Sequence, residues 1–355
     1  MVASIYCETQ AFARKRGPEW LRPLGEVEYA NGVAAMTADA DCRVAAGIMG
    51  HADMTLGSRI GELLDRCLAA TPDRFRGVRQ VTVEYPDDRP FRYVMTYKPP
   101  AGILDTPGFP LALAEVEKRG LTFDAGVFDP TLPKLAAMVD RSPDLTFVLD
   151  HMGIAVGVDM DAAEKTEVFR AWRSGLRALA ERPNVECKIG GLGMPTWGFG
   201  FEERAGPVGY AALAEAWRPY VETAIEAFGV GRCMMESNFP PDGRSCGYVP
   251  LWNALKHITR GATAEERSAL FSGNAARVYR IDAVGGDGWT RAMLASEFTA
   301  WRRGRSTSPA FRPRATATAL DRTRPFQERR AGSWRAGRRT SASRPSACWS
   351  GTPTS

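Results

Sequence analysis

The sequence contains very little histidine and no closely spaced cysteines. Three histidines occur in 355 residues, at positions 51, 151 and 257, and no two of them form an HxH pair. The seven cysteines include no CxxC pair, so neither a zinc knuckle nor a disulfide framework is expected. The apolar runs are far shorter than the roughly 20 residues that span a bilayer, and the start MVASIYCETQ lacks a secretory signal pattern. These absences predict a cytoplasmic protein with reduced cysteines.

Lysine is absent from the C-terminal part of the chain, where arginine is abundant. Residues 283–355 hold 14 arginines and four acidic residues, a net charge of +10, whereas residues 1–282 carry −5. The tail has no sustained apolar period and is rich in Ser, Thr, Pro and Ala, which predicts a disordered segment separate from the body. Its composition resembles GC-rich DNA read out of frame. An arginine tail that binds nucleic acid is the less favoured alternative.

Residues 1–282 show alternating strand and helix patterns. Short apolar segments have the character of buried strands, and amphipathic stretches lie between them. GxGxxG, the glycine pattern of a dinucleotide site, is absent. The alternation favours an α/β fold of the (β/α)8 TIM-barrel type. Because only seven strands are found, this barrel is expected to lack its first strand and to be truncated at its N-terminus.

The expected strands span residues 3–8, 43–49, 75–81, 121–128, 145–150, 185–189 and 232–236. The expected helices include 57–70, 108–119, 130–142, 163–182, 210–228 and 248–260, and a last one after the capping box of Thr263 and Glu266.

Polar residues follow the ends of most of these strands. The carboxyl ends of TIM-barrel strands surround the active site, so these side chains are expected to share one mouth. His151 follows the run FVLD, Lys188 lies in VECKI, and Glu236 and Asn238 end the stretch RCMMESN. Glu8, Asp53, Asp124 and Asp150 are further polar residues at strand ends. The other candidates are Arg79, Gln80, His51 and Asp129, together with Trp197 in a glycine- and aromatic-rich loop, which either covers the mouth or is a flexible connection.

Each candidate also has a structural interpretation. A lone histidine is often a hydrogen-bonded structural residue, and this interpretation is favoured for His51, whereas the two are balanced for His151. A lysine at the end of a buried strand needs a negatively charged partner or an anionic ligand, because an unpaired buried charge is unfavourable. Glu236, on the neighbouring strand, is the candidate partner of Lys188, and such an ion pair and a catalytic role for the lysine are balanced. His257 lies near the end of a predicted helix, where it suits the helix dipole.

Several motifs together resemble the amidohydrolase-related proteins, the TIM-barrel branch of the amidohydrolase superfamily that includes sugar-lactone and pyrone-dicarboxylate lactonases. The motifs are FVLDHMG, VECKIGGLGMPTWGFGF, RCMMESNFPPD and LFSGNAARVYR, with RVAAGIMGHADMTLG nearer the start. The resemblance covers residues 1 to about 281. It implies a hydrolase that attacks a small cyclic ester or amide with an activated water.

The same resemblance assigns roles to individual residues. His151 matches the histidine that ends the LDHxG strand, and Asn238 stands where many relatives carry an aspartate base, although an asparagine cannot act as one. The divalent metal of the superfamily, zinc, is not expected, because HxH is absent and His151 is the only plausible ligand. In a metal-independent scheme, Lys188 or an arginine would polarise the carbonyl. Asp129, Glu236 or His151 would then activate the water.

Other functions stay open at this stage. A non-catalytic barrel remnant could bind a small anion or a partner through its open seam, and the chain could be inactive as written. A decarboxylase or hydratase could use the same scaffold, because fold does not fix function. A small-molecule substrate and a homo-oligomer are among the expected partners, whereas a membrane or nucleic acid is not.

Overall fold

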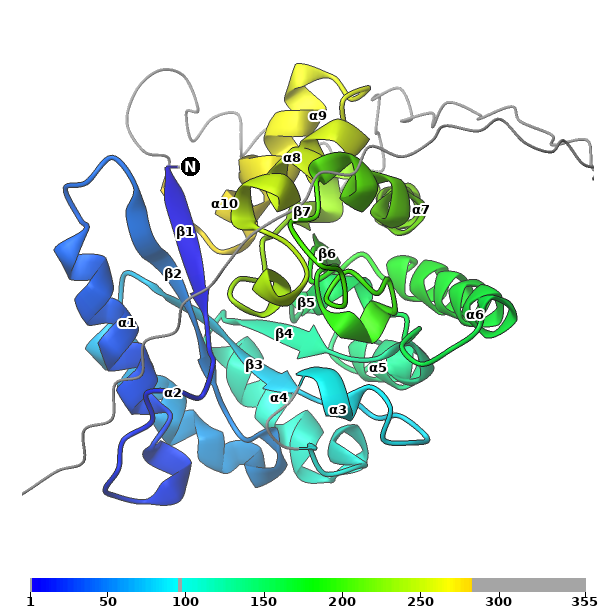
Figure 1. Ribbon diagram of the computed structural model, residues 1–355. Helices are drawn as coiled ribbons and strands as arrows, with labels where there is room; N and C mark the ends of the chain where they lie inside the picture. The colour runs from blue at the N-terminus through cyan, green and yellow to red at the C-terminus, as the bar shows by residue number, and fades with distance from the viewer. Residues whose placement is uncertain (1, 95–97, 283–355) are drawn as a thin grey trace, which may run out of the picture. The chain divides into compact units, whose positions relative to one another are not determined.

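The computed structural model describes residues 2–94 and 98–282, and the predicted disordered tail, residues 283–355, lies outside the described residues. The described residues form one parallel sheet whose seven strands follow chain order, as Figure 1 shows. This arrangement confirms the α/β prediction and the number of strands. The strands are β1 Ala3–Cys7, β2 Arg43–His51, β3 Phe75–Val81, β4 Thr122–Gly126, β5 Phe147–Leu149, β6 Val185–Ile189 and β7 Cys233–Met235.

Helices connect successive strands, because two parallel neighbours can be joined only by a crossover that returns along the sheet. These crossovers cover the outer, convex face of the curled sheet (Figure 1). Within residues 2–94 and 98–282, no helix is long and apolar enough to cross a membrane. The helices are α1 Leu24–Met36, α2 Ile60–Ala70, α3 Phe91–Val94, α4 Gly108–Lys118, α5 Leu132–Val139, α6 Ala162–Ala180, α7 Tyr210–Phe228, α8 Tyr248–Ile258, α9 Ala264–Ser268 and α10 Asn274–Val278.

Helix α1 is not among the helices predicted from the sequence. Its buried face includes two alanines and the charged Glu26, so the apolar stripe is weak. Glu26 is buried because its carboxylate accepts hydrogen bonds from the Tyr6 hydroxyl at 2.8 Å and from the Thr9 backbone at 2.7 Å. Helix α1 therefore fixes the segment that leaves β1. The predicted capping box of Thr263 and Glu266 is present at the start of α9.

Alternate residues of each strand point to opposite faces of the sheet, and this alternation divides the interior into two parts. In β6, Val185, Cys187 and Ile189 pack in the larger core between sheet and helices. Lys188 lies on the inner, concave face. A smaller apolar cluster fills that face, and it consists of Met49, Val148, Met234, Val278 and Tyr279. The inner face can therefore hold charged groups above an apolar floor.

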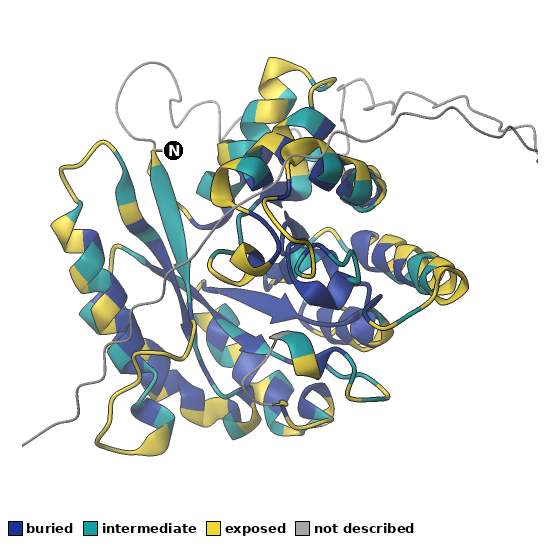
Figure 2. Cartoon of the chain, in the orientation of Figure 1, coloured by how far each residue is buried: buried dark blue, intermediate teal, exposed yellow. Residues whose placement is uncertain are grey.

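The strands differ in how deeply they are buried. Figure 2 shows β4 to β7 as almost wholly buried, whereas every residue of β1 has intermediate exposure. At the other end of the described chain, the residues after α10 return to the inner face, where Tyr279 is fully buried. The Arg280 guanidinium donates a hydrogen bond of 2.6 Å to the Gly120 carbonyl, just before β4. This return segment closes the floor of the site.

Candidate active site

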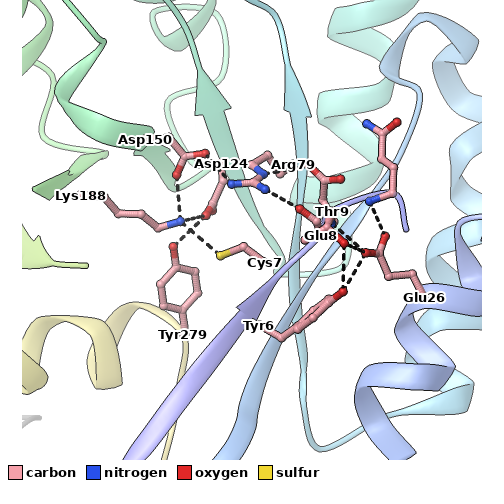
Figure 3. Close-up of polar contacts among 11 residues, drawn as sticks. Tyr6, Cys7, Glu8, Thr9, Glu26, Arg79, Asp124, Asp150, Lys188 and Tyr279 are labelled. Carbon is pink, nitrogen blue, oxygen red and sulfur yellow. Dashed lines mark hydrogen bonds and ion pairs between the residues drawn. The ribbon is translucent and has the colours of Figure 1, made fainter. Parts of the chain in front are cut away.

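A buried cluster of charges lies on the inner face of the sheet, and Figure 3 shows the ring of Tyr279 beside it. The Lys188 ammonium donates to Asp124 Oδ2 at 2.6 Å and to Asp150 Oδ1 at 2.8 Å. It also lies 3.7 Å from Cys7 Sγ. The Tyr279 hydroxyl donates to Asp124 Oδ2 at 2.9 Å from the floor. The ammonium is thus enclosed by groups from β1, β4 and the end of β5.

Arg79 continues this cluster toward β1. Its Nε donates to Glu8 Oε1 at 2.9 Å, and one terminal nitrogen donates to the Glu8 carbonyl at 2.5 Å. The other terminal nitrogen lies 3.5 Å from Asp150 Oδ2, which is an ion pair without hydrogen-bond geometry, since this oxygen has no hydrogen-bond partner. We call Glu8, Arg79, Asp124, Asp150 and Lys188 the inner ion cluster.

The charges of the inner ion cluster stabilise one another. Burial acts against the charged form of Lys188, but Asp124 and Asp150 outweigh it and raise the pKa of Lys188 well above its ordinary value. Burial would likewise raise the pKa of Asp150, yet Lys188 and Arg79 hold it far below its usual range. For Asp124 burial prevails, and its pKa rises to about 6. Lys188 and Asp150 therefore remain charged at neutral pH.

A second polar pair, which we call the mouth dyad, lies nearer to solvent. His151 Nδ1 is 2.5 Å from Glu236 Oε1, and the two side chains retain 12% and 18% of their exposure. Burial acts against protonation of His151, but the charge and hydrogen bond of Glu236 outweigh it and raise the pKa of His151. The same pairing lowers the pKa of Glu236 against its own burial. The dyad is a histidine whose tautomer and basicity are set by a carboxylate.

The backbone around the mouth dyad is strained. His151 has φ 52° and ψ 34° within the turn Asp150–Met152, and Asn238 has φ 46°. Such left-handed conformations are unfavourable for residues other than glycine, and they are concentrated at functional sites. Strain of this kind persists only where the surroundings enforce the geometry. The turn after β5 therefore fixes where the His151 side chain leaves the backbone, and the contact with Glu236 orients its ring.

The glycine-rich loop after β6 packs directly on the dyad. A Cβ atom at Gly191 would lie 2.6 Å from His151 Cγ, and one at Gly190 would collide with Glu236 Cγ. Gly191 also has φ +68°, a conformation that side chains rarely adopt. The loop backbone can approach His151 and Glu236 only because both positions are glycine. The loop backbone therefore lies directly against both side chains of the dyad.

Asp242 fastens the same loop to the turn after β7. Its two carboxylate oxygens accept hydrogen bonds from Asn238 Nδ2 at 2.8 Å and from the Gly193 backbone at 3.1 Å. The side chain is fully buried, and burial raises its pKa to about 7 in spite of these two donors. Asn238 therefore binds Asp242 and helps it to hold the loop. It lies beside the dyad, two residues after Glu236, but is not part of it.

The remaining candidates predicted from the sequence are Trp197, Gln80 and Asp129, which form hydrogen bonds outside the dyad, and His51, which has a ring nitrogen that is unpaired within the described residues. Trp197 is buried and donates from Nε1 to the Gly191 carbonyl at 2.9 Å, so it holds the glycine-rich loop. Gln80 accepts from the Met54 backbone at 2.9 Å. Asp129 accepts from the Val156 backbone at 3.0 Å, and burial raises its pKa to about 6. His51 ends β2, and its buried Nδ1 has no hydrogen-bond partner.

The prediction that Lys188 pairs with Glu236 is wrong. Lys188 binds Asp124 and Asp150, whereas Glu236 binds His151. In a curled parallel sheet, the inward side chains of one layer come from alternate strands. Accordingly β6 contacts β4 across β5, and the residues after β5 and β7 meet each other.

Sequence reasoning also missed three residues that the site uses: Cys7, Asp242 and Tyr279. Asp242 had a visible signal, because it closes the quoted motif RCMMESNFPPD. Tyr279 had none, since a tyrosine that follows a helix gives no indication that it returns to the interior of the sheet. Cys7 is an isolated cysteine in a short strand, and only the fold brings it to Lys188.

The family model described as Amidohydrolase matches residues 16–281. The chain belongs to the amidohydrolase family. Among curated proteins, it is 35% identical to the uncharacterized protein y4mH of Sinorhizobium fredii, over 73% of this chain and 76% of that protein. It is 30% identical to the L-fucono-1,5-lactonase of Burkholderia ambifaria, over 62% of this chain and 66% of that enzyme.

A solved structure supports the fold of this amidohydrolase. A crystal structure of an amidohydrolase from Burkholderia multivorans with bound Zn superposes with a TM-score of 0.56 at 23% identity. The match covers 76% of this chain and 90% of that one. The prediction of a TIM-barrel relative is therefore confirmed.

The residues present do not fit the metal centre that this family implies. Within the described part of the chain, no group of three His, Cys, Asp or Glu side chains could hold a metal ion. The carboxylates that converge on the inner face, Asp124 and Asp150, both bind the Lys188 ammonium. A zinc site needs several ligand atoms at about 2.0–2.3 Å from one point, and here a protein cation occupies that point.

Proposed function

We propose that this amidohydrolase hydrolyses a small lactone with water activated by the mouth dyad. The observation that carries the proposal is the contact of 2.5 Å between His151 Nδ1 and Glu236 Oε1 beneath a glycine-rich loop. A carboxylate on Nδ1 keeps the proton on that nitrogen, so Nε2 is left to accept a proton. Both side chains retain partial exposure, which a group that meets water and substrate requires.

The steps of the reaction follow from this geometry. A water oxygen attacks the lactone carbonyl carbon while Nε2 of His151 takes the water proton. The C=O bond opens to a tetrahedral oxyanion, which then collapses and breaks the ring C–O bond. The departing alkoxide takes the proton back from the imidazolium, and a hydroxy acid results. Glu236 stabilises the imidazolium throughout without becoming protonated.

Arg79 is the cation best suited to stabilise the oxyanion. It retains 16% of its side-chain exposure, and its contact with Asp150 is a long one of 3.5 Å. One terminal nitrogen could therefore turn toward a developing charge without breaking its bonds to Glu8. Lys188, by comparison, is 4% exposed and fully surrounded. Asn238, which binds Asp242 beside the dyad, takes no proton in this scheme.

The names of two relatives support a lactone as the substrate class. Two L-fucono-1,5-lactonases, from Burkholderia ambifaria and Burkholderia multivorans, are 30% and 28% identical to this chain. A lactone also suits the dyad, because its ring oxygen leaves as an alkoxide that needs only one proton. Decarboxylation and hydration lack a comparable feature at this site.

The proposal is tested with a panel of sugar lactones, L-fucono-1,5-lactone among them, by following acid release with a pH indicator against the spontaneous rate. We expect hydrolysis by the wild type and a loss of ~10²–10⁴-fold in His151→Ala and Glu236→Gln, the range of general-base catalysis. His257→Ala is the matched control, since His257 lies on α8 against Tyr210 and should leave the rate unchanged. Equal rates in all four proteins would rule out the dyad, and release of carbon dioxide would indicate a decarboxylase instead.

A further inference from the structure

We propose that Lys188 is a built-in cation that takes the place of a divalent metal on the inner face of this amidohydrolase. On this view, its ammonium neutralises the carboxylates that would otherwise need a metal ion, and it does not contact the substrate. The inference goes beyond the proposed lactonase function, because it concerns what holds the site together and which ion the site excludes.

The position of the ammonium carries the argument. Lys188 Nζ lies 2.6 Å from Asp124 Oδ2 and 2.8 Å from Asp150 Oδ1, and Cys7 Sγ is 3.7 Å away. Two carboxylate oxygens and a sulfur are the kinds of atom that bind zinc in proteins. All three lie around the lysine nitrogen, and with the ammonium between them they do not form a metal-binding group. An ion could enter only if the ammonium left.

The surroundings of Lys188 indicate that its ammonium is a permanent part of the buried cluster and not a group that binds a ligand. Lys188 is 4% exposed, and Asp124 and Asp150 are 0% and 1% exposed. Tyr279 closes the cluster from below with a hydrogen bond to Asp124. Met49, Val148 and Met234 fill the floor around it. A substrate carbonyl at the mouth would meet the mouth dyad and Arg79 before it met this nitrogen.

The charges also require a cation at this point. Glu8, Asp124 and Asp150 are all buried, and Arg79 binds Glu8 and approaches Asp150. Within residues 2–94 and 98–282, Lys188 is the only cation that forms an ion pair with Asp124. Without the lysine, two buried carboxylates would face each other, which is strongly unfavourable unless a proton or a metal ion replaces the charge.

The first experiment measures the metal content and the thermal unfolding of the full chain. The wild type should contain no stoichiometric zinc or manganese, and neither EDTA nor added Zn²⁺ or Mn²⁺ should change its Tm. Lys188→Met should have a clearly lower Tm, and Zn²⁺ should raise that Tm in a saturable way. The double variant Lys188→Met/Asp124→Asn, which removes one anion with the cation, should recover much of the lost Tm without metal.

The control is Lys165→Met, which removes a lysine whose ammonium donates a hydrogen bond of 2.7 Å to the Gly198 carbonyl. Its Tm should not respond to Zn²⁺. One equivalent of tightly bound metal in the wild type, removed by EDTA with a fall in Tm, would overturn the inference. So would a Lys188→Met variant that neither Zn²⁺ nor Asp124→Asn stabilises. If Lys188→Met does not fold, the double variant alone decides, because a built-in cation predicts that it folds better. None of these readouts depends on lactone hydrolysis, so the inference and the proposed function can fail separately.

Discussion

The inner ion cluster and the mouth dyad are built from the same kinds of side chain but differ in surroundings. In the cluster, Lys188 is 4% exposed and binds two carboxylates that are themselves fully buried. In the dyad, His151 and Glu236 are 12% and 18% exposed, bind mainly each other and follow strand ends, and the backbone of His151 is strained. A buried charge with several partners is a structural element, whereas a partly exposed pair with an unused nitrogen can carry out chemistry.

The largest expected effect is a loss of stability when the inner ion cluster is disrupted. Asp124→Ala removes the anion that binds both Lys188 and Tyr279, and it leaves a buried cation with a cavity beside it. The free energy of unfolding should fall by about 3–5 kcal/mol, the usual result of breaking a buried ion pair from one side. Urea unfolding measures the change.

Asp65→Ala is the control for that experiment. Asp65 also binds an arginine, Arg119, at 2.7 Å, but its side chain is 64% exposed. The expected loss is below about 1 kcal/mol, because solvent screens exposed pairs. Similar losses in the two variants would show that burial does not distinguish the inner ion cluster from an ordinary surface pair.

A smaller effect on stability, with a specific effect on the dyad, is expected from Gly191→Ala. The new Cβ would lie 2.6 Å from His151 Cγ, and φ +68° adds a strain of about 1–2 kcal/mol. Gly200→Ala is a close match, since Gly200 has φ +67° but no atom within 4 Å of the new Cβ. Both variants should lose the stability that corresponds to this backbone strain, and Gly191→Ala should lose more because its Cβ also collides with the His151 ring. Only Gly191→Ala should shift the NMR signals of His151 and slow lactone hydrolysis. If Gly200→Ala slows hydrolysis equally, loop strain rather than contact with His151 is responsible.

The smallest effect is the response of the dyad to pH. The pKa of His151 is raised by Glu236, so protonated His151 stabilises the folded state. This stabilisation is fully present below the unfolded pKa of roughly 6.5, and it is lost as the pH rises through the higher folded pKa. If His151 acts as a base, the rate of hydrolysis should rise over the same pH interval.

An NMR titration of the wild type and Glu236→Gln measures this response directly. Three histidines in the chain keep the spectra simple, and His151→Ala assigns the relevant signal. Glu236→Gln should lower the pKa of His151, because the charge is lost while a hydrogen-bond acceptor remains. An unchanged titration of His151 would mean that Glu236 does not control the basicity of the imidazole.

The fold was largely predictable because its signals are local. Apolar runs such as FVLD and VECKI mark buried strands, and amphipathic stretches between them mark crossover helices. Helix α1 was missed where this signal fails, since its buried face relies on alanines and on Glu26, whose hydrogen-bond partners lie elsewhere in the chain. The positions of His151 and Glu236 at strand ends were also readable, because strand ends are local features.

The sequence by itself determined which side chains end the strands, and therefore that His151, Lys188 and Glu236 would lie toward one edge of a parallel sheet. Only the tertiary structure decided which of them pair. Adjacent strands offer neighbours in sequence order, but the curl of the sheet brings the inward side chains of alternate strands together. Lys188 therefore meets Asp124 of β4 across β5, in addition to Asp150 at the end of the adjacent β5, and His151 is left to Glu236. The return of Tyr279 to the floor was decided in the same way, because burying its ring depends on the sheet being curled around it.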